Sequence, residues 1–357
     1  MRALLHAPGR CRAFTALTLA LTLGAALATQ ASAASYEVFD LGAGVAPRDI
    51  NNAGVIVGSR LLPDQSRVGF RIAPSGTLED LKGTIEARAI DDEGRIVGST
   101  AAGAFLFDKA LVPLGEGSSA SGINANGLVA GGQPGSNPYR PSPLPINPAF
   151  YKIARGKWKV LNVANVYPRG TRKGVYADVY ALADINDNGY AVGTKSRTGL
   201  YGSAVFTLRA KSQEVNFLSI PNGRAAAVNN LEHIVGSASF HTDSGMYAHA
   251  FLHDGTSLVD LGTLNGGLSS SAADINENDE VVGSAWLETV PTSVYDPTSY
   301  HAFLWANSLM SDLNDALPPN PGWLLTAATA INDQGDIVGT GLRGGVAHGF
   351  LLRRTGP

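Results

Sequence analysis

One short pattern recurs seven times along the chain, and this repeat constrains the fold more than any other feature. In each copy an apolar residue is followed by Asn or Asp and then by two variable residues. The next position is usually Gly, and a short run of β-forming residues follows it. The copies occupy residues 50–58, 90–98, 123–131, 183–193, 228–236, 275–283 and 331–339. Asn and Asp start turns through side-chain hydrogen bonds, and Gly adopts the positive φ angle that a tight turn requires. Each copy is therefore predicted to be a β-hairpin.

Two further motifs follow the hairpins and define the size of the repeating unit. A motif such as HAFLH (residues 249–253) follows every hairpin, and a motif such as LVDL (residues 258–261) follows six of them. The seventh motif of this last kind, YEVFDL at residues 36–41, precedes the first hairpin. In a closed ring of four-stranded blades, the strand at the start of the chain would complete the last blade, which lacks a fourth strand of its own. The average hairpin spacing of about 47 residues also fits propeller blades of about 40 to 50 residues.

The sequence therefore predicts an all-β, seven-bladed β-propeller, closed when the N-terminal strand pairs into the last blade. Residues 34–357 would form this single domain. Six blades with an additional hairpin is the alternative, because the hairpins that begin at Ile90 and Ile123 are only 33 residues apart.

The triplets at residues 249–251 and 301–303 both read His-Ala-Phe, and degenerate forms occupy the same place in the other repeats. In this feature the chain resembles the extracellular HAF repeat family, which is named for that triplet. The resemblance extends over nearly all of the chain after its first 33 residues. The resemblance implies a secreted, propeller-like protein. The family has no established catalytic residues that could be assigned to positions in this chain.

Residues 1–33 have the features of a secretory signal peptide. Three arginines occur within the first 12 residues, an apolar run covers residues 13–27, and the small residues Ala31-Ser32-Ala33 suit signal peptidase. The apolar run is shorter than the roughly 20 residues that a membrane span needs. We therefore expect a secreted or periplasmic protein with no membrane span after the signal is removed.

Cysteine content and charge narrow the possible functions. The single cysteine, Cys11, lies within the predicted signal, so the exported domain would have neither disulfides nor thiol chemistry. Loss of three arginines with the signal changes the formal net charge from −3 to −6. A mildly acidic chain without a basic run is a poor candidate for nucleic-acid binding.

Four long insertions are predicted to lie on one face of the propeller, at residues 132–147, 163–179, 287–299 and 314–325. This face carries the connections from strand two to strand three and from blade to blade. Loops on a rigid scaffold often carry function, although insertions also accumulate there at little cost. Aromatic rings beside basic groups suit sugar rings or acidic polysaccharides. The predicted ligand-binding residues are Tyr139, Arg140, Tyr167, Arg169, Arg172, Lys173, Tyr176, Tyr295 and Trp323.

Motifs for metal or nucleophilic chemistry are incomplete, and we expect no cofactor and no metal. Residues 184–189 match the start of a calcium loop, but Lys195 occupies the position of the bidentate Glu. The repeated His249, His301 and His348 are interpreted as structural hydrogen-bonding residues, because equivalent positions in adjacent blades are too far apart to share a zinc ion. The 42 glycines are assigned to turns.

The acidic residues fall into two groups with different predicted roles. Asp40, Asp80, Asp260 and Asp312 recur in the fourth strands, which predicts hydrogen bonding to turns. Asp178, Glu288 and Asp296 lie in the variable loops and would be the candidates for acid catalysis.

The favoured function is a non-enzymatic binding or scaffold propeller that recognises extracellular or cell-surface polysaccharide and acts as a monomer. One alternative is a polysaccharide lyase or hydrolase that uses the long-loop face. Another is a structural envelope protein that binds a protein partner through Trp323 and the exposed tyrosines.

Overall fold

The computed structural model describes residues 35–134, 146–160, 178–197, 202–212, 214–243, 245–288, 296–319 and 322–356. The chain divides into two compact units, Met1–Ser32 and Ala33–Pro357, and every described residue belongs to the second. Within the described ranges no helix is long and apolar enough to cross a membrane. The helical content there is two 3-10 turns, η1 (Ile153–Arg155) and η2 (Pro297–Ser299).

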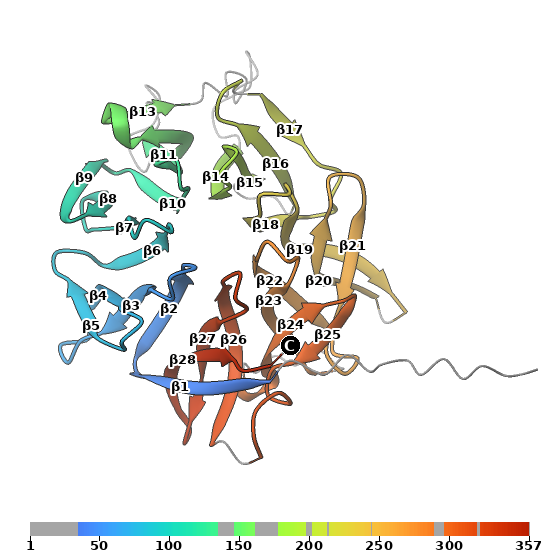
Figure 1. Ribbon diagram of the computed structural model, residues 1–357. Coiled ribbons are helices and arrows are strands. Elements are labelled where there is room, and N and C mark those ends of the chain that lie inside the picture. The colour runs from blue at the N-terminus through green and yellow to red at the C-terminus, as the bar shows by residue number, and fades with distance from the viewer. Residues whose placement is uncertain are drawn as a thin grey trace, which may run out of the picture. The chain divides into compact units, whose positions relative to one another are not determined.

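The second unit consists of seven four-stranded antiparallel sheets that follow one another around an axis (Figure 1). The first three blades are β2 (Val45–Ile50), β3 (Ile56–Leu61), β4 (Arg67–Ile72) and β5 (Leu78–Leu81); β6 (Glu86–Ile90), β7 (Ile96–Ser99), β8 (Gly103–Asp108) and β9 (Ala110–Glu116); and β10 (Ser119–Ile123), β11 (Leu128–Pro134), β12 (Ile146–Lys152) and β13 (Lys157–Val160). The predicted seven-bladed propeller is confirmed, and the closely spaced second unit is a complete blade.

The remaining blades have the same order from the axis outward. They are β14 (Asp178–Ile185), β15 (Tyr190–Arg197), β16 (Ser203–Arg209) and β17 (Val215–Phe217); β18 (Arg224–Val228), β19 (Ile234–Thr242), β20 (Gly245–His253) and β21 (Leu258–Gly262); β22 (Ser269–Ile275), β23 (Val281–Trp286), β24 (Tyr300–Ala306) and β25 (Leu309–Asp312); and β26 (Trp323–Ile331), β27 (Ile337–Arg343), β28 (Val346–Arg354) and β1 (Tyr36–Ala43).

The N-terminal strand closes the ring as predicted. β1 pairs antiparallel with β28, from Tyr36 opposite Arg354 to Ala43 opposite His348. The Tyr36 side chain is buried, and its hydroxyl accepts a hydrogen bond of 3.1 Å from Arg354. The first strand of the chain is thus the fourth strand of the last blade, so strand pairing stabilises the closure.

The histidines of the second motif are structural, as predicted. His249 lies 3.0 Å from Asp260, His301 lies 2.5 Å from Asp312, and His348 lies 2.8 Å from Asp40. Each pair joins the third and fourth strands of one blade. The aspartates also accept hydrogen bonds of 2.8 Å from the backbone N–H two residues further along the chain, at Gly262, Asn314 and Gly42 respectively. Turn bonding is therefore confirmed for Asp312, because Asn314 lies in a turn, whereas Gly262 and Gly42 belong to the fourth strands themselves. Asp80 pairs with Arg60 at 2.6 Å.

The prediction that the glycines serve turns is wrong for the glycine that ends each repeat copy. These glycines lie in the second strand of each blade, and six of them pair with a buried Phe of the third strand: Gly58 with Phe70, Gly98 with Phe105, Gly193 with Phe206, Gly236 with Phe251, Gly283 with Phe303 and Gly339 with Phe350. A Cβ atom at Gly98 would lie 2.0 Å from the Glu86 carbonyl oxygen and 2.9 Å from the Phe105 ring. The glycine is needed because the first strand and the Phe ring approach its backbone closely.

Candidate functional site

Most of the predicted ligand-binding residues lie outside the described residues. These are Tyr139, Arg140, Tyr167, Arg169, Arg172, Lys173, Tyr176 and Tyr295. Trp323 is described, and it is the first residue of β26 rather than part of a loop. It is half-buried and lies edge-on to His348 and Phe350, with ring centroids 6.0 and 6.3 Å away. The predicted position of Trp323 in a loop is therefore wrong, and the ring is only partly exposed because it packs within its own blade. Binding of a ligand or partner by Trp323 stays a prediction.

The loop carboxylates proposed as acid catalysts have local structural roles where their side chains are described. Asp296 caps η2 and accepts hydrogen bonds from the Thr298 backbone and hydroxyl at 2.8 and 2.7 Å. The Thr298 hydroxyl and backbone lower the pKa of Asp296, which makes it a poorer proton donor near neutral pH. Glu288 accepts a hydrogen bond of 2.9 Å from Ser299. Asp178 begins β14, and its side chain is outside the described structure.

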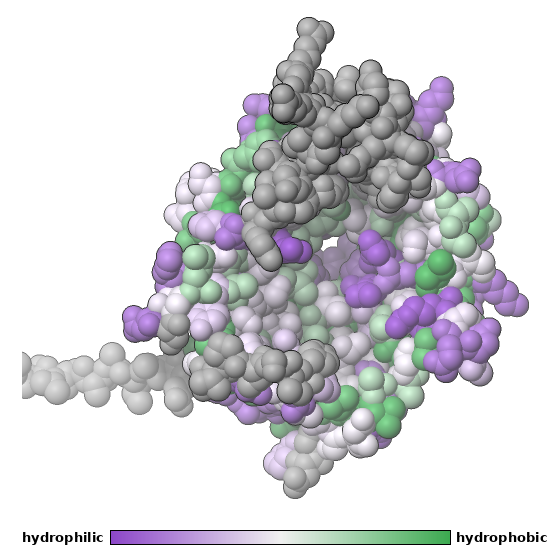
Figure 2. All heavy atoms as spheres, turned by 180° about the vertical axis from the view of Figure 1, so that it is seen from behind, coloured by the Kyte–Doolittle hydropathy of each residue, from purple (hydrophilic) through white to green (hydrophobic). Residues whose placement is uncertain are grey.

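The first strand of every blade lines an axial channel, and the repeat turns surround one end of it. At this end a cavity of about 260 Å³ is lined by the turn residues of all seven hairpins. Figure 2 shows one face of the ring, hollowed at its centre and with hydrophilic residues around the opening. A site on this axis can receive side chains from every blade.

Six asparagines of the repeat turns form a ring of hydrogen bonds between blades, which we call the Asn belt. Each donates through Nδ2 to the backbone carbonyl of the equivalent residue in the next blade. The distances are 2.9 Å for Asn51 to Asp91, 2.8 Å for Asn124 to Asn186, 2.9 Å for Asn186 to Asn229, 3.1 Å for Asn229 to Asn276, 3.0 Å for Asn276 to Asn332 and 3.2 Å for Asn332 to Asn51. The repeated turn residue therefore joins neighbouring blades as well as forming its own turn.

The seventh position of the Asn belt is Asp91, which has no amide group to donate. Arg95 supplies the missing donor. Its guanidinium group bonds the Asp91 carboxylate at 2.6 Å and the carbonyl oxygen of Ala125, in the next blade, at 2.8 Å. An Asp and an Arg together replace one Asn, so the belt continues around the whole axis.

A second ring lies one residue further along each turn. Here backbone N–H groups donate to side-chain oxygens of the next blade: Asn52 to Asp92, Ala125 to Asp187, Asp187 to Asn230, Asn230 to Glu277, Glu277 to Asp333 and Asp333 to Asn52. Of the residues that resemble a calcium loop, Asp184 accepts a hydrogen bond from the Val228 backbone at 3.0 Å and Asn186 accepts one from the Tyr190 backbone at 2.9 Å. Within the described residues, no group of three or more His, Cys, Asp or Glu side chains is arranged to hold a metal ion.

Removal of one belt asparagine is expected to destabilise the propeller. Asn186→Ala deletes the Nδ2 bond to Asn229 and the 2.9 Å bond that Oδ1 accepts from the Tyr190 backbone, which leaves buried backbone groups unpaired. We expect a loss of about 2 to 3 kcal/mol in the free energy of unfolding, measured by urea denaturation. Asn188→Ala in the same turn removes only an exposed 3.1 Å bond and should cost less than about 1 kcal/mol. Equal losses in the two variants would contradict a special role for the belt.

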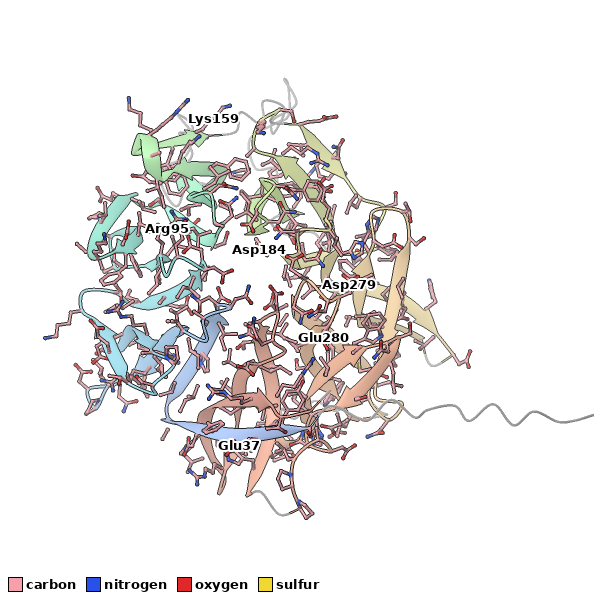
Figure 3. The ribbon with its side chains drawn as sticks, viewed as in Figure 1. Glu37, Arg95, Lys159, Asp184, Asp279 and Glu280 are labelled. Carbon is pink, nitrogen blue, oxygen red and sulfur yellow. The ribbon has the colours of Figure 1, made fainter. Side chains whose placement is uncertain are left out.

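Three aspartates, Asp49, Asp184 and Asp274, form a carboxylate layer beside the Asn belt. Each lies two residues before the belt residue of its blade and accepts a hydrogen bond from the backbone of the next blade, at Ile90 (2.8 Å), Val228 (3.0 Å) and Ile331 (2.9 Å). Figure 3 shows Asp184 at the inner edge of its blade, whereas Lys159 lies at the outer rim. Burial raises the pKa of Asp49 to about 6 and the pKa of Asp184 to about 7. Burial and the nearby Asp49 raise the pKa of Asp274 well above its ordinary value.

The carboxylate layer is expected to make the propeller less stable as pH rises from about 4 to about 7. In the unfolded chain these carboxyl groups lose their protons near pH 3.9. The folded state keeps the protons of Asp49 and Asp184 up to pKa values of about 6 and about 7, so it binds more protons in this window. At about 1.4 kcal/mol per pKa unit, the contribution amounts to a few kcal/mol.

Asp274→Ala tests this prediction, because Ala occupies the equivalent position in three other blades, at Ala89, Ala227 and Ala330. Burial lowers the pKa of His253, which gives the opposite pH trend, so the variant must be compared with the wild type. Urea unfolding at pH 5 and pH 8 should show a smaller loss of stability in the variant. The same pH dependence in both proteins would show that Asp274 does not carry the effect.

The other half of the channel is basic. Arg48 of β2, Arg88 of β6 and Arg224 of β18 are exposed residues of innermost strands. Arg48 and Arg88 bond the same carboxylate, Glu86, at 2.7 and 2.8 Å. We call this region the arginine half of the channel. Sequence reasoning missed it, because the three arginines are isolated in the sequence and only the ring brings their strands to one axis.

A second cavity, of about 500 Å³, lies away from the axis between the outer strands of the first two blades. It is lined by Glu79, Asp80, Leu81, Lys82, Phe107 and Leu111. Asp80 is paired with Arg60, and Glu79 with Arg71 at 2.7 Å. The axial channel is the stronger candidate because residues from all seven blades can act there together.

The closed ring and its axial channel define a seven-bladed β-propeller, and comparison with known proteins gives its family. Residues 116–347, more than half of the chain, match the family described as "Protein of unknown function (DUF3466)", and the chain belongs to that family. No curated protein matches the chain in sequence.

Similar solved structures show the same fold. The oligogalacturonate lyase from Vibrio parahaemolyticus has a TM-score of 0.52 at 9% identity, and the match covers 89% of this chain and 93% of the lyase. A prolyl endopeptidase has a TM-score of 0.55 at 10% identity, with 90% of this chain and 51% of that chain covered. The chain thus spans about half the length of the endopeptidase. At such low sequence identity, these similarities show only that the fold is shared.

Proposed function

We propose that this protein is an exported, non-enzymatic propeller that binds polysaccharide at the end of the axial channel opposite the Asn belt. The supporting observation is the arginine half of the channel, which lies at the end where the long insertions enter and leave the blades. Guanidinium groups hydrogen-bond sugar hydroxyl and acidic groups in a defined geometry. Small residues such as Ser121, Ala183 and Ala226 occupy neighbouring positions on the inner strands and leave room beside the arginines.

The repeat residues themselves support a scaffold role. The belt asparagines bond the next blade, the histidines bond aspartates within a blade, and the buried phenylalanines cover strand glycines. Because these roles are structural in blade after blade, a ligand is best sought at positions where the blades differ. The His-Ala-Phe triplets and the signal-like residues 1–33 support placing the chain among extracellular repeat proteins, as part of the same proposal.

One similar structure is an oligogalacturonate lyase, so a lyase must be distinguished from a binding protein in the same experiment. The protein beginning at Ala34 is titrated into soluble neutral and acidic polysaccharides, and heat release and polymer cleavage are recorded together. We expect binding without the appearance of new chain ends. Cleavage would favour the enzyme alternative, and no binding to any polymer would contradict the proposal.

A further inference from the structure

We propose, building on the function above, that the ligand is an anionic polysaccharide whose carboxylate or sulfate groups are bound by Arg48, Arg88 and Arg224 in the arginine half of the channel. Arginine forms paired, charge-assisted hydrogen bonds with both kinds of anion. The inference therefore names the class of polymer and the side chains that would recognise it.

Two of the arginines occupy a special position on the innermost strands. Arg48 and Arg88 are the extra residues of β-bulges, since the strand register shifts between Pro47 and Asp49 and again between Ala87 and Ala89. A bulge bends the strand and redirects a side chain. Every inner strand of the ring has a bulge at this place, but the five other blades carry small residues there, namely Ser121, Ala183, Ala226, Ala273 and Thr329. Two adjacent blades thus present arginine where the others present Ser, Ala or Thr.

Glu86 fixes these two arginines as a pair. One carboxylate oxygen accepts from Arg48 Nε at 2.7 Å, and the other accepts from Arg88 at 2.8 and 3.2 Å. Burial alone would raise the pKa of Glu86, but Arg88 and Arg48 lower it, so the group remains ionised. The Glu86 side chain is only 13% exposed, whereas Arg48 and Arg88 are 48% and 49% exposed. A mostly covered carboxylate therefore positions two exposed guanidinium groups, and the trio has one net positive charge.

Arg224 provides a second point of contact from the far side of the channel. It lies five residues before the belt residue Asn229, as Glu86 lies five before Asp91, so the two residues are at the same level of the ring. Their blades, the fifth and the second, are three apart in a ring of seven, which places them on nearly opposite walls. The Arg224 side chain is exposed, and it makes no hydrogen bond or ion pair with another described residue. An exposed cation without a protein partner can bind an anion without first breaking an ion pair.

The charges at the two ends of the channel give the site a direction. Asp49 and Asp274, together with Asp92, Asp187, Glu277 and Asp333, line the cavity at the Asn belt, and no Lys or Arg is among its described lining residues. An anionic chain is attracted to the arginine half and repelled by the opposite end. We infer that it enters at the arginine end and does not pass through the ring.

The test compares charged and neutral forms of the same polymers. The protein from Ala34 onward is titrated with polygalacturonate and its methyl-esterified form, and with dextran sulfate and dextran. We expect binding to at least one anionic polymer and at least tenfold weaker binding to its neutral counterpart. The two anionic polymers distinguish a carboxylate ligand from a sulfate ligand, and either result supports the proposal.

Variants then locate the site. Arg224→Ala and Arg88→Ala should each weaken binding about tenfold or more, the effect of losing one charged hydrogen bond. Arg209→Ala is the matched control, because Arg209 is also 49% exposed and ion-paired, with Glu232 at 2.7 Å, but lies on the third strand of its blade. Thermal melts establish that each variant is folded.

The outcomes separate this inference from the proposed function. Equal binding to neutral and anionic polymers would overturn the inference and leave polysaccharide binding intact. Anionic binding that neither Arg224→Ala nor Arg88→Ala weakens would also overturn it. No binding to any polymer would overturn the proposed function itself.

Discussion

Deletion of residues 36–41 is expected to destabilise the whole propeller, because it removes most of β1 and leaves β28 as an open edge. The deletion exposes the core around Tyr36, which is 4% exposed, and breaks the pair between Asp40 and His348. Truncation of one large buried aromatic side chain costs about 3 to 5 kcal/mol by itself. We therefore expect the melting temperature to fall on the order of 10 °C, or the protein not to fold. Calorimetry of the deleted and intact proteins measures the effect.

Glu37→Ala is the matched control for this deletion, since Glu37 is an exposed residue of the same strand. It should melt within a degree or two of the wild type, because surface substitutions usually change stability by less than about 0.5 kcal/mol. A peptide spanning residues 35–43 should raise the melting temperature of the deleted protein in a concentration-dependent way, since it binds only the folded ring. An unchanged melting temperature after the deletion would contradict closure by β1.

Gly236→Ala is expected to have the second large effect, a loss of about 3 kcal/mol or more in the free energy of unfolding. A Cβ at this position would lie 1.9 Å from the Arg224 carbonyl oxygen and 3.1 Å from the Ala225 Cα. Both are backbone atoms of the neighbouring strand, so the blade would have to separate β18 from β19. Urea denaturation measures the loss.

A turn glycine from another copy of the repeat provides the comparison. Gly54 has a φ angle of +75°, and a Cβ there would meet no atom within 4 Å. Gly54→Ala should cost only about 1 to 2 kcal/mol, the penalty for a left-handed backbone conformation without a clash. If Gly54→Ala proved as costly as Gly236→Ala, backbone conformation rather than close strand approach would explain the role of the repeat glycines.

The architecture could be predicted from the sequence because its determinants are local and repeated. An Asn or Asp begins the turn in each of seven places, and a Gly follows it in five of them, whereas Glu232 and Asp279 take that position in the other two. The β-forming runs predict the flanking strands. The strand motif at residues 36–41 precedes the first hairpin, and the last repeat lacks a fourth strand. The sequence therefore predicts that this N-terminal strand completes the last blade and closes the ring. The roles of His249, His301 and His348 were predictable too, because residues that recur at the same place in several units usually have a structural role in the unit.

The candidate site required the tertiary structure. Arg48, Arg88 and Arg224 are separated by up to 176 positions and have no common motif, so only closure of the ring places their strands around one axis. The β-bulges that contain Arg48 and Arg88 depend on strand register, which the repeat pattern does not specify. Trp323 illustrates the converse error: the sequence pattern places it within the long insertion at residues 314–325, whereas in the structure it begins β26 and packs against Phe350.

The sequence by itself determined the propeller class, the order of the repeats and the way the ring closes, since these follow from turn chemistry and from counting strands within each repeat. It predicted seven blades with six as the alternative, and the structure decided for seven because the short second unit is a complete blade. The tertiary structure decided which side chains share the channel and which glycines lie under a Phe ring. It also decided how Asp91 and Arg95 together replace an asparagine of the belt. These outcomes depend on contacts between strands and blades far apart in the chain, whose geometry is set only when the ring packs.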